Sequence, residues 1–425
     1  MITIPSKLAR LAVIALLVGA SSARADVLDT SMPRTVAFGP SRGAAPSERI
    51  DPQRTGRSRS RLPEAPVELW RRHVSGNVDV APVVDEAGNI IVALSSGEVV
   101  KLSPDARELW RFRTGGGSAV ASPTLLNDGT IAVITSTGSA WGLAPSGAVR
   151  FFTPLGVSRR DVDTAPLALA EGGLLVAAGS ALVELGADGS IRARASLEDR
   201  PLGAEPLLER ASGAVVEGPR GALVTAVSGN VYRFRPPAPP LKIGSFGGVA
   251  TRGAMLADAR TLVAVVDGRR LVALDLPTGT AHVRASGVPL DSPPALTPSG
   301  LVVVSTQLGL LIGLDAAGNE KFHASLEKAA PAPTGVIVGV SLTPAAAEMK
   351  PSPPVVIDPD GRVAFVRANG RAGLLTGVEG KDPRRAPGKV ILSERVCAAP
   401  IAVVPAGDKR VLITCRDGGL WMYGE

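Results

Sequence analysis

The sequence predicts an all-β fold, an eight-bladed β-propeller of four-stranded antiparallel blades. A unit of about 40 residues recurs along the chain, and its fullest copy reads ELWRFRTGGGSAVASPTLLNDGTIAVITSTGSAWGLAPSG from Glu108 to Gly147. Within the unit, short runs rich in Val, Ile, Leu and Thr alternate with Gly, Asp and Asn turns, as expected of strands joined by hairpins. A repeat of this length and content is typical of one propeller blade.

The number of blades follows from a proline that opens an apolar run before each turn. This anchor recurs at steps of 40 to 60 residues, and Gly253 takes its place in one unit. The prolines are Pro82, Pro123, Pro166, Pro206, Pro294, Pro354 and Pro400. Eight anchors indicate eight blades, whose continuously apolar runs suit sheets that are buried on both faces.

The two ends of the repeat region predict how the ring closes. Only three strand-like runs, PIAVV, VLITC and LWMYG, belong to the last unit, whereas VELWRRHVS stands before the first anchor without a blade of its own. One N-terminal strand and three C-terminal strands are therefore expected to form the eighth sheet, which leaves no free edge. The propeller is assigned to residues 62–425. An irregular insertion at about 329–352 is either a surface excursion or a binding loop, since loops on a rigid ring tolerate both.

The N-terminal 25 residues have the pattern of a cleavable signal peptide. Lys7 and Arg10 precede the apolar run LAVIALLVGA, and the small-residue site Ala23-Arg24-Ala25 follows it. The run is too short to span a bilayer, which takes about 20 apolar residues. No cysteine follows the run, which disfavours a lipid anchor. The mature protein is expected in the periplasm or outside the cell, without a transmembrane segment.

The formal net charge of +7 is concentrated near the N-terminus. Loss of the signal peptide removes Lys7, Arg10 and Arg24, and residues 26–61 hold seven arginines against four acids, so the propeller itself is nearly neutral. Residues 26–61, rich in Pro, Ser and Arg, are predicted to be a flexible leader. The alternative is weak contact of residues 54–61 with an anionic surface. Export argues against nucleic acid as a partner.

The tryptophans and cysteines each permit a structural interpretation. Trp70 and Trp110 stand at one repeat position, and Trp141 and Trp421 at another, which predicts packing between blades rather than cofactor stacking.

The only cysteines, Cys397 and Cys415, flank the hairpin of the last blade. In an oxidising compartment they form either a disulfide or two buried thiols, because a diagonal placement leaves the bridging geometry open.

No set of residues with the spacing of a metal or catalytic site is found in the sequence. The acidic segments 161–163 and 358–361 could supply calcium ligands, but the second falls where each unit turns between its first two strands, which favours a turn. His73, His282 and His323 are isolated from one another and from any ligand spacing. GxSxG, P-loop, HExxH and CxxC motifs are absent from the sequence.

Several segments resemble the quinoprotein-like (PQQ-like) eight-bladed propellers. They are DPQRTGRSRSRLPEAPVELWRRHVSG (51–76), the repeated unit with its S-P and D-G-T-I elements, and the turns LVALDLPTG (271–279) and LIGLDAAGN (311–319). The resemblance covers residues 51–425 and implies the propeller fold. Catalytic members of that family hold pyrroloquinoline quinone with calcium, an Asp base, an aromatic platform and often adjacent cysteines. This chain has no adjacent cysteines and only 3% aromatic residues.

The sequence therefore favours the non-catalytic branch, with no catalytic, cofactor-binding or metal-binding residue and no cofactor. The expected function is that of an exported, non-enzymatic propeller that serves as a rigid protein-binding or scaffold module in the cell envelope. Its partner would be another envelope protein or an extended polymer. Two alternatives stay open: a divergent PQQ- and calcium-dependent dehydrogenase, and a propeller that binds envelope polysaccharide.

Overall fold

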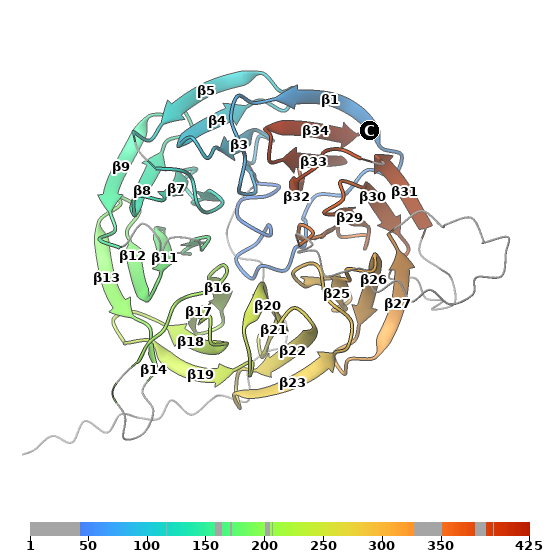
Figure 1. Cartoon of the computed structure of the whole chain (residues 1–425). Helices are drawn as coiled ribbons and strands as arrows, with labels where there is room; N and C mark the ends of the chain where they lie inside the picture. Colours follow the sequence, from blue (N-terminus) through green and yellow to red (C-terminus); the bar gives the residue numbers. More distant parts are fainter. Residues whose placement is uncertain are drawn as a thin grey trace, which may run out of the picture.

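The protein is a closed ring of eight four-stranded antiparallel sheets around a central axis (Figure 1). The computed structural model describes residues 43–425 except 116, 158–163, 171, 200–204, 206, 327–350, 379–387 and 394. The predicted all-β class and the predicted number of blades are confirmed. In the part of the chain that is described, no helix is both long and apolar enough to cross a membrane.

Each blade runs from an inner strand at the axis to an outer strand at the rim. Blade 1 contains β2 (Val83–Val84), β3 (Ile90–Ala93), β4 (Glu98–Leu102) and β5 (Glu108–Arg113). Blade 2 contains β6 (Thr124–Leu125), β7 (Ile131–Thr135), β8 (Ser139–Leu143) and β9 (Val149–Pro154). Blade 3 contains β10 (Leu167–Ala168), β11 (Leu174–Ala178), β12 (Ala181–Leu185) and β13 (Ile191–Ser196). Blade 4 contains β16 (Val216–Gly218), β17 (Gly221–Thr225), β18 (Asn230–Phe234) and β19 (Leu241–Ser245).

The second half of the ring repeats this order. Blade 5 contains β20 (Ala250–Asp258), β21 (Thr261–Val266), β22 (Arg270–Asp275) and β23 (Thr280–Ala285). Blade 6 contains β24 (Ala295–Leu296), β25 (Val302–Ser305), β26 (Leu310–Leu314) and β27 (Glu320–Ser325). Blade 7 contains β28 (Val356–Ile357), β29 (Val363–Val366), β30 (Ala372–Thr376) and β31 (Gly388–Ser393).

Blade 8 combines the two ends of the chain. Its strand order is β1 (Val67–His73), β34 (Gly419–Gly424), β33 (Arg410–Cys415) and β32 (Pro400–Pro405). β1 is antiparallel to β34, with Val67 opposite Gly424 and His73 opposite Gly419. The predicted closure by one N-terminal strand and three C-terminal strands is therefore confirmed.

The hydrophobic core lies between the blades. Each of the eight clusters of buried apolar residues joins two neighbouring blades, and one of them joins blade 8 to blade 1. In β7 all five residues are buried, because both faces of the sheet meet a neighbour. This two-sided burial explains why the apolar runs of the sequence are continuous rather than alternating.

The prediction that the inner strand of blade 4 follows Pro206 is wrong. Pro206 itself lies outside the described residues, and the pair that follows it, β15 (Leu207–Leu208), is paired with β14 (Glu198–Asp199) in a separate two-stranded sheet. The inner strand of blade 4 is β16, nine residues later. Val215 and Val216 are buried there, whereas both leucines of β15 are exposed. The segment with the buried valines forms the inner strand, because an inner strand packs against two neighbouring blades and its side chains are covered on both faces.

Candidate functional site

Residues 43–61 lie along the axis of the ring, where the inner edges of the blades meet (Figure 1). Successive residues of this axial segment form backbone hydrogen bonds with successive blades around the ring. The Leu125 N–H of blade 2 donates to Pro46 O at 2.8 Å, and the Leu256 N–H of blade 5 donates to Gln53 O at 2.9 Å. Equivalent bonds join Leu296 to Thr55, Ile357 to Gly56 and Lys409 to Arg61, in blades 6, 7 and 8.

These bonds satisfy the inner edges of the sheets. An inner strand presents N–H groups towards the axis, and a buried N–H without an acceptor is costly. The axial segment supplies the missing carbonyl groups, and in blade 1 the pairing is reciprocal, since Ala45 and Val84 bond to each other in both directions. The segment is thus a structural part of the ring.

Arg54 is the central side chain of the axial segment. It is fully buried, and its guanidinium donates to three carbonyl groups: Pro166 O at 2.7 Å, Val215 O at 3.0 Å and Glu48 O at 2.8 Å. The first two carbonyls belong to blade 3 and to the edge of blade 4. Burial lowers the pKa of Arg54, while the charges of Glu48 and Asp51 oppose that shift. The five-donor geometry of arginine suits this role, because three separate carbonyls are reached from one side chain.

Asp51 and Arg49 complete the buried polar group. Asp51 accepts hydrogen bonds from the Thr55 N–H at 2.9 Å and from the Thr55 hydroxyl, which closes the D-x-x-R-T-G turn on itself. Burial raises the pKa of Asp51, although the bonds from Thr55 act in the other direction. Arg49 donates to Ala254 O at 3.0 Å and to Pro294 O. Burial lowers the pKa of Arg49 to about 10, so it is cationic at neutral pH.

The prediction of a flexible leader is therefore wrong for residues 43–61. Contact of residues 54–61 with an anionic surface is likewise contradicted for Arg54, which is entirely enclosed. Composition misled the sequence analysis, because a segment rich in Arg, Ser and Pro is ordinarily solvated. The signal that identifies the axial segment is the turn motif Asp51, Arg54, Thr55 and Gly56. Residues 1–42, including the predicted signal peptide, lie outside the described residues.

The described residues do not form a calcium site of the kind that holds a quinone cofactor. The axial segment occupies part of the axis, and a cavity of about 480 Å³ that remains there is lined by Glu48, Arg49 and Asp79 together with the inner edges of several blades. Among the described residues, no group of three or more His, Cys, Asp and Glu side chains is placed to hold a metal ion. Asp291 and Asp358, both buried, already accept hydrogen bonds from Ser352 and from Leu62 respectively.

The acidic and histidine candidates are separated in the structure. Asp358 begins the turn between β28 and β29 and accepts the N–H of Asp360 at 2.9 Å, as the turn interpretation predicts. Residues 161–163 lie outside the described residues. The three histidines lie apart, His73 in β1 of blade 8, His282 in β23 of blade 5 and His323 in β27 of blade 6.

The tryptophans lie at the outer strands and third strands of the blades. Trp70 donates its indole N–H to Pro104 O and Trp110 to Pro145 O, each at 2.9 Å and each in the next blade. Gly147 has a φ of +89°, and a Cβ there would lie 2.9 Å from the Trp110 ring, so this turn needs glycine. Trp141 packs with Phe112 and Phe152, and the Arg71 guanidinium lies 4.3 Å from the Trp421 ring centroid.

Cys397 and Cys415 form a disulfide in the structure. Cys415 ends β33, and Cys397 precedes β32, so the bridge joins the approach to the innermost strand of blade 8 to its neighbour. No free cysteine remains. The bridge lies in the one blade that is assembled from both ends of the chain.

The rim between blades 3 and 4 carries the most exposed apolar pair of the described residues. β14 and β15 form a two-stranded sheet that projects from the ring, close to β19 in Figure 1. Asp199 of β14 accepts the Lys242 ammonium of β19 at 3.0 Å, which ties the projection to blade 4. Leu207 and Leu208 are 61% and 70% exposed.

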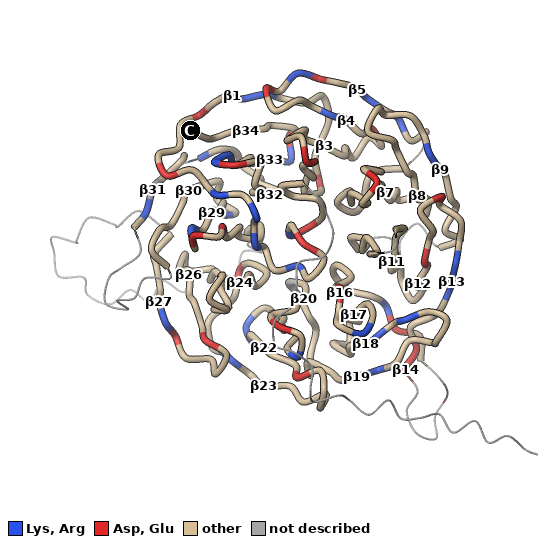
Figure 2. Tube along the Cα trace, turned by 180° about the vertical axis from the view of Figure 1, so that it is seen from behind, with Lys and Arg blue, Asp and Glu red and all other residues tan. Residues whose placement is uncertain are grey.

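A groove of about 630 Å³ lies beside this projection. Its walls are β13 and β14 on one side and the turn between β18 and β19 on the other, with Phe234, Leu241 and prolines among the lining residues. Elsewhere on the rim, charges of both signs recur around the circumference instead of gathering in one patch (Figure 2). Single exposed apolar residues also lie on other outer strands, such as Phe152 of β9 and Val283 of β23, but the projection places two adjacent exposed leucines beside a groove. We name the projection and the groove together the rim site (β14, β15 and the groove).

Known structures share the fold at low sequence identity. The chain is similar to BamB from Moraxella catarrhalis, with 13% identity, coverage of 86% of this chain and 92% of that one, and a TM-score of 0.51. It is also similar to the quinohemoprotein alcohol dehydrogenase ADHIIG from Pseudomonas putida HK5, with 11% identity, coverage of 91% and 80%, and a TM-score of 0.63. A europium-containing methanol dehydrogenase has 12% identity, coverage of 90% and 98%, and a TM-score of 0.62.

No known family model matches the sequence, and no curated protein matches it. At these identities the similar structures establish only the architecture. Two dehydrogenases and BamB share that architecture, so it does not indicate an activity. The chain shares the eight-bladed propeller fold with these structures.

Proposed function

We propose that this protein is a non-enzymatic binding platform of the cell envelope that holds a partner protein at its rim site. The observation that carries the proposal is that the chain's own residues 43–61 bond to the blades along the axis. A propeller that used its axis for a cofactor would need room and oxygen ligands there. In this chain, Arg49, Arg54 and the backbone of the axial segment occupy part of that space and bond to the blades, and a cavity of about 480 Å³ remains beside Glu48 and Arg49.

The rim site supports protein binding because it presents apolar side chains on a fixed base. Behind Leu207 and Leu208, the Glu209 carboxylate accepts the Asn230 amide at 2.6 Å and the Ser228 hydroxyl at 2.5 Å. These bonds join the end of β15 to blade 4. Exposed apolar residues next to a groove and surrounded by polar residues are typical of interaction sites.

The envelope location is proposed from the N-terminal sequence. The pattern of residues 1–25 favours export, and the Cys397–Cys415 bridge is of a kind that persists in oxidising compartments. An exported platform would meet other envelope proteins as partners. BamB is an architectural relative only, so its role is not transferred to this chain.

The binding test uses a photo-crosslinking amino acid at position 208 of the full chain, expressed in its native host. We expect one specific crosslinked protein, which mass spectrometry identifies. The control places the same amino acid at Leu308, which is 68% exposed in the turn between β25 and β26. Capture of the partner should also be lost in a Leu207→Ser, Leu208→Ser variant and kept in Leu308→Ser. Equal crosslinking at positions 208 and 308 would refute the rim site.

The enzymatic alternative has a test of its own. Purified protein is mixed with pyrroloquinoline quinone and calcium, and reduction of an electron-acceptor dye is followed with alcohols and sugars as substrates. We expect no reduction above that of quinone and calcium alone. Dye reduction that depends on the protein would overturn the platform proposal.

A further inference from the structure

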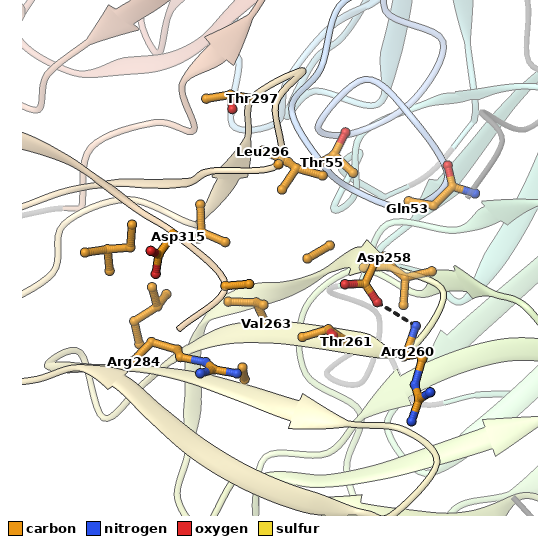
Figure 3. Close-up of a pocket in the computed structure, with 18 of the residues that line it drawn as sticks. Gln53, Thr55, Asp258, Arg260, Thr261, Val263, Arg284, Leu296, Thr297 and Asp315 are labelled. Atoms are coloured by element: carbon orange, nitrogen blue, oxygen red, sulfur yellow. Dashed lines mark hydrogen bonds between the residues drawn. The ribbon is translucent and has the colours of Figure 1, made fainter. Parts of the chain in front are cut away.

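A cavity of about 720 Å³ lies between blades 5 and 6, apart from the rim site. It extends from the axial segment, where Gln53 and Thr55 line it, to Arg284 on the outer strand β23 (Figure 3). A volume of this size accommodates a small organic molecule, and ligand sites of proteins commonly have such volumes.

The cavity exists where the sequence departs from its own repeat. In blades 8 and 1 the outer strand carries Trp70 or Trp110, and each indole reaches a turn of the next blade. The outer strand of blade 5 reads TAHVRA, and the smaller ring of His282, which lines the cavity, stands at the position of Trp110. Imidazole is smaller than indole, so His282 takes up less space at this interface than the tryptophans of blades 8 and 1 do at theirs, and Arg284 also lines the cavity.

The walls of the cavity are apolar and belong to the core between the two blades. Val263 and Leu271 come from blade 5, and Leu296 and Leu314 come from blade 6. Each of the four is at least nine-tenths buried, which fixes its position. A ligand body placed between these walls would exclude water from apolar surface, which favours binding.

Arg284 lines this cavity and has no partner for its charge. Its side chain is half-buried, and within the described part of the chain it forms no hydrogen bond or ion pair. In Figure 3 it lies below Asp315 and extends towards Thr261. A guanidinium in such a position is suited to a carboxylate, which it can bind through two parallel hydrogen bonds.

The three acidic residues of the lining, Asp258, Asp275 and Asp315, are already engaged, and Asp275 pairs with Arg260 at 3.9 Å. Asp315 accepts the Asn319 side-chain amide at 3.0 Å, pairs with Lys321 at 3.0 Å and accepts the backbone N–H groups of Asn319 and Ala317, and these bonds hold its pKa far below the ordinary value. Asp258 accepts the Arg260 N–H at 2.8 Å. The charge of Asp315 is thus offset by Lys321, while that of Arg284 is not offset by a contact.

We propose that the cavity binds an amphipathic organic anion, a molecule with one carboxylate and an apolar body of one or two rings. The carboxylate pairs with Arg284, and the apolar body lies between the leucine and valine walls. This site is independent of the rim site, so either proposal can fail without the other.

The test is a calorimetric titration of the full mature protein with 1-naphthoate as the probe. We expect saturable binding, and Arg284→Gln should weaken it at least about tenfold, because a hydrogen-bonded charge is lost. 1-Naphthalenemethanol, which lacks the charge, and acetate, which lacks the rings, should each bind at least about tenfold more weakly than naphthoate. Thermal melting of the variant checks that the fold is intact.

Arg269→Gln is the matched control, since Arg269 is an exposed arginine in the turn between β21 and β22 and does not line the cavity. Its affinity for naphthoate should equal that of the unsubstituted protein. Absence of naphthoate binding, equal binding by Arg284→Gln, or equal weakening by Arg269→Gln would each overturn the proposal.

Discussion

Arg54 connects parts of the chain that are far apart in sequence. Its donors reach carbonyl groups 161 residues away at Val215 and 112 residues away at Pro166. A buried carbonyl that loses its donor has no access to water, so the loss is larger than that of a surface hydrogen bond. The stability of the ring should therefore depend on this single side chain.

We expect Arg54→Met to lower the free energy of unfolding by about 3 kcal/mol or more, since three buried acceptors lose a charged donor. Arg59→Met is the control, because Arg59 is exposed in the same segment. Chemical denaturation of both variants, monitored by circular dichroism, measures the difference. A loss as small for Arg54→Met as for Arg59→Met would contradict the assigned role.

The disulfide gives a second prediction at the residue scale. The bridge closes a loop with a sequence separation of 18 residues, and a loop of this length corresponds to about 3 kcal/mol of stabilisation. Reduction with dithiothreitol should lower the melting temperature of the protein. The variant Cys397→Ser, Cys415→Ser should melt at the lower temperature with or without the reductant. If reduction leaves the melting temperature of the unsubstituted protein unchanged, the bridge contributes nothing to stability.

In blade 8, an ion pair and hydrogen bonds of Glu425 link the N-terminal strand to the C-terminal strands. The Glu425 side chain accepts the N–H groups of Glu64 and Ala65, which lead into β1, and pairs with Lys409. These bonds, that from Lys409 first, lower the pKa of Glu425 from 4.5 to about 2. The contact therefore joins the strand from the beginning of the chain to those from its end.

A carboxyl group with a lowered pKa stabilises the folded state above the pKa that it has when unfolded. That contribution is lost as the pH falls from about 4.5 to about 2. Glu425→Gln should lower the melting temperature at pH 7, and the difference from the unsubstituted protein should vanish near pH 2. Glu86→Gln, an exposed carboxyl in the turn between β2 and β3, is the control. A difference for Glu425→Gln that stays constant with pH would contradict this assignment.

Local turn chemistry made most strands predictable. The Asn127-Asp128-Gly129 turn is identifiable in the sequence because the Asp128 side chain caps it, with the Thr130 N–H at 2.9 Å, and Gly129 adopts a φ of +80°. Pro206 misled the prediction because the strand after it has the right composition but no neighbouring blade to cover it. Burial by another part of the chain was needed to identify β16 as the inner strand.

At the scale of the whole molecule, the closure of the ring was predictable and the segment along its axis was not. The closure follows from counting strands at the two ends of the repeat. The axial segment has no repeat and no apolar run, and its role depends on bonds to blades that are distant in sequence. Only the D-x-x-R-T-G motif signals it, and the motif gives no indication of where it lies. The rim site and the cavity likewise arise from neighbouring blades.

The measurement that tests the account most directly is hydrogen exchange of the full chain by mass spectrometry, with and without pyrroloquinoline quinone and calcium. We expect the amides of residues 45–58 to be protected as strongly as those of the inner strands, because the axial segment bonds to the blades around it. Addition of quinone and calcium should leave that protection unchanged. Rapid exchange in residues 45–58, or a change there on adding the cofactor, would contradict a ring in which the chain's own residues bond to the blades along the axis.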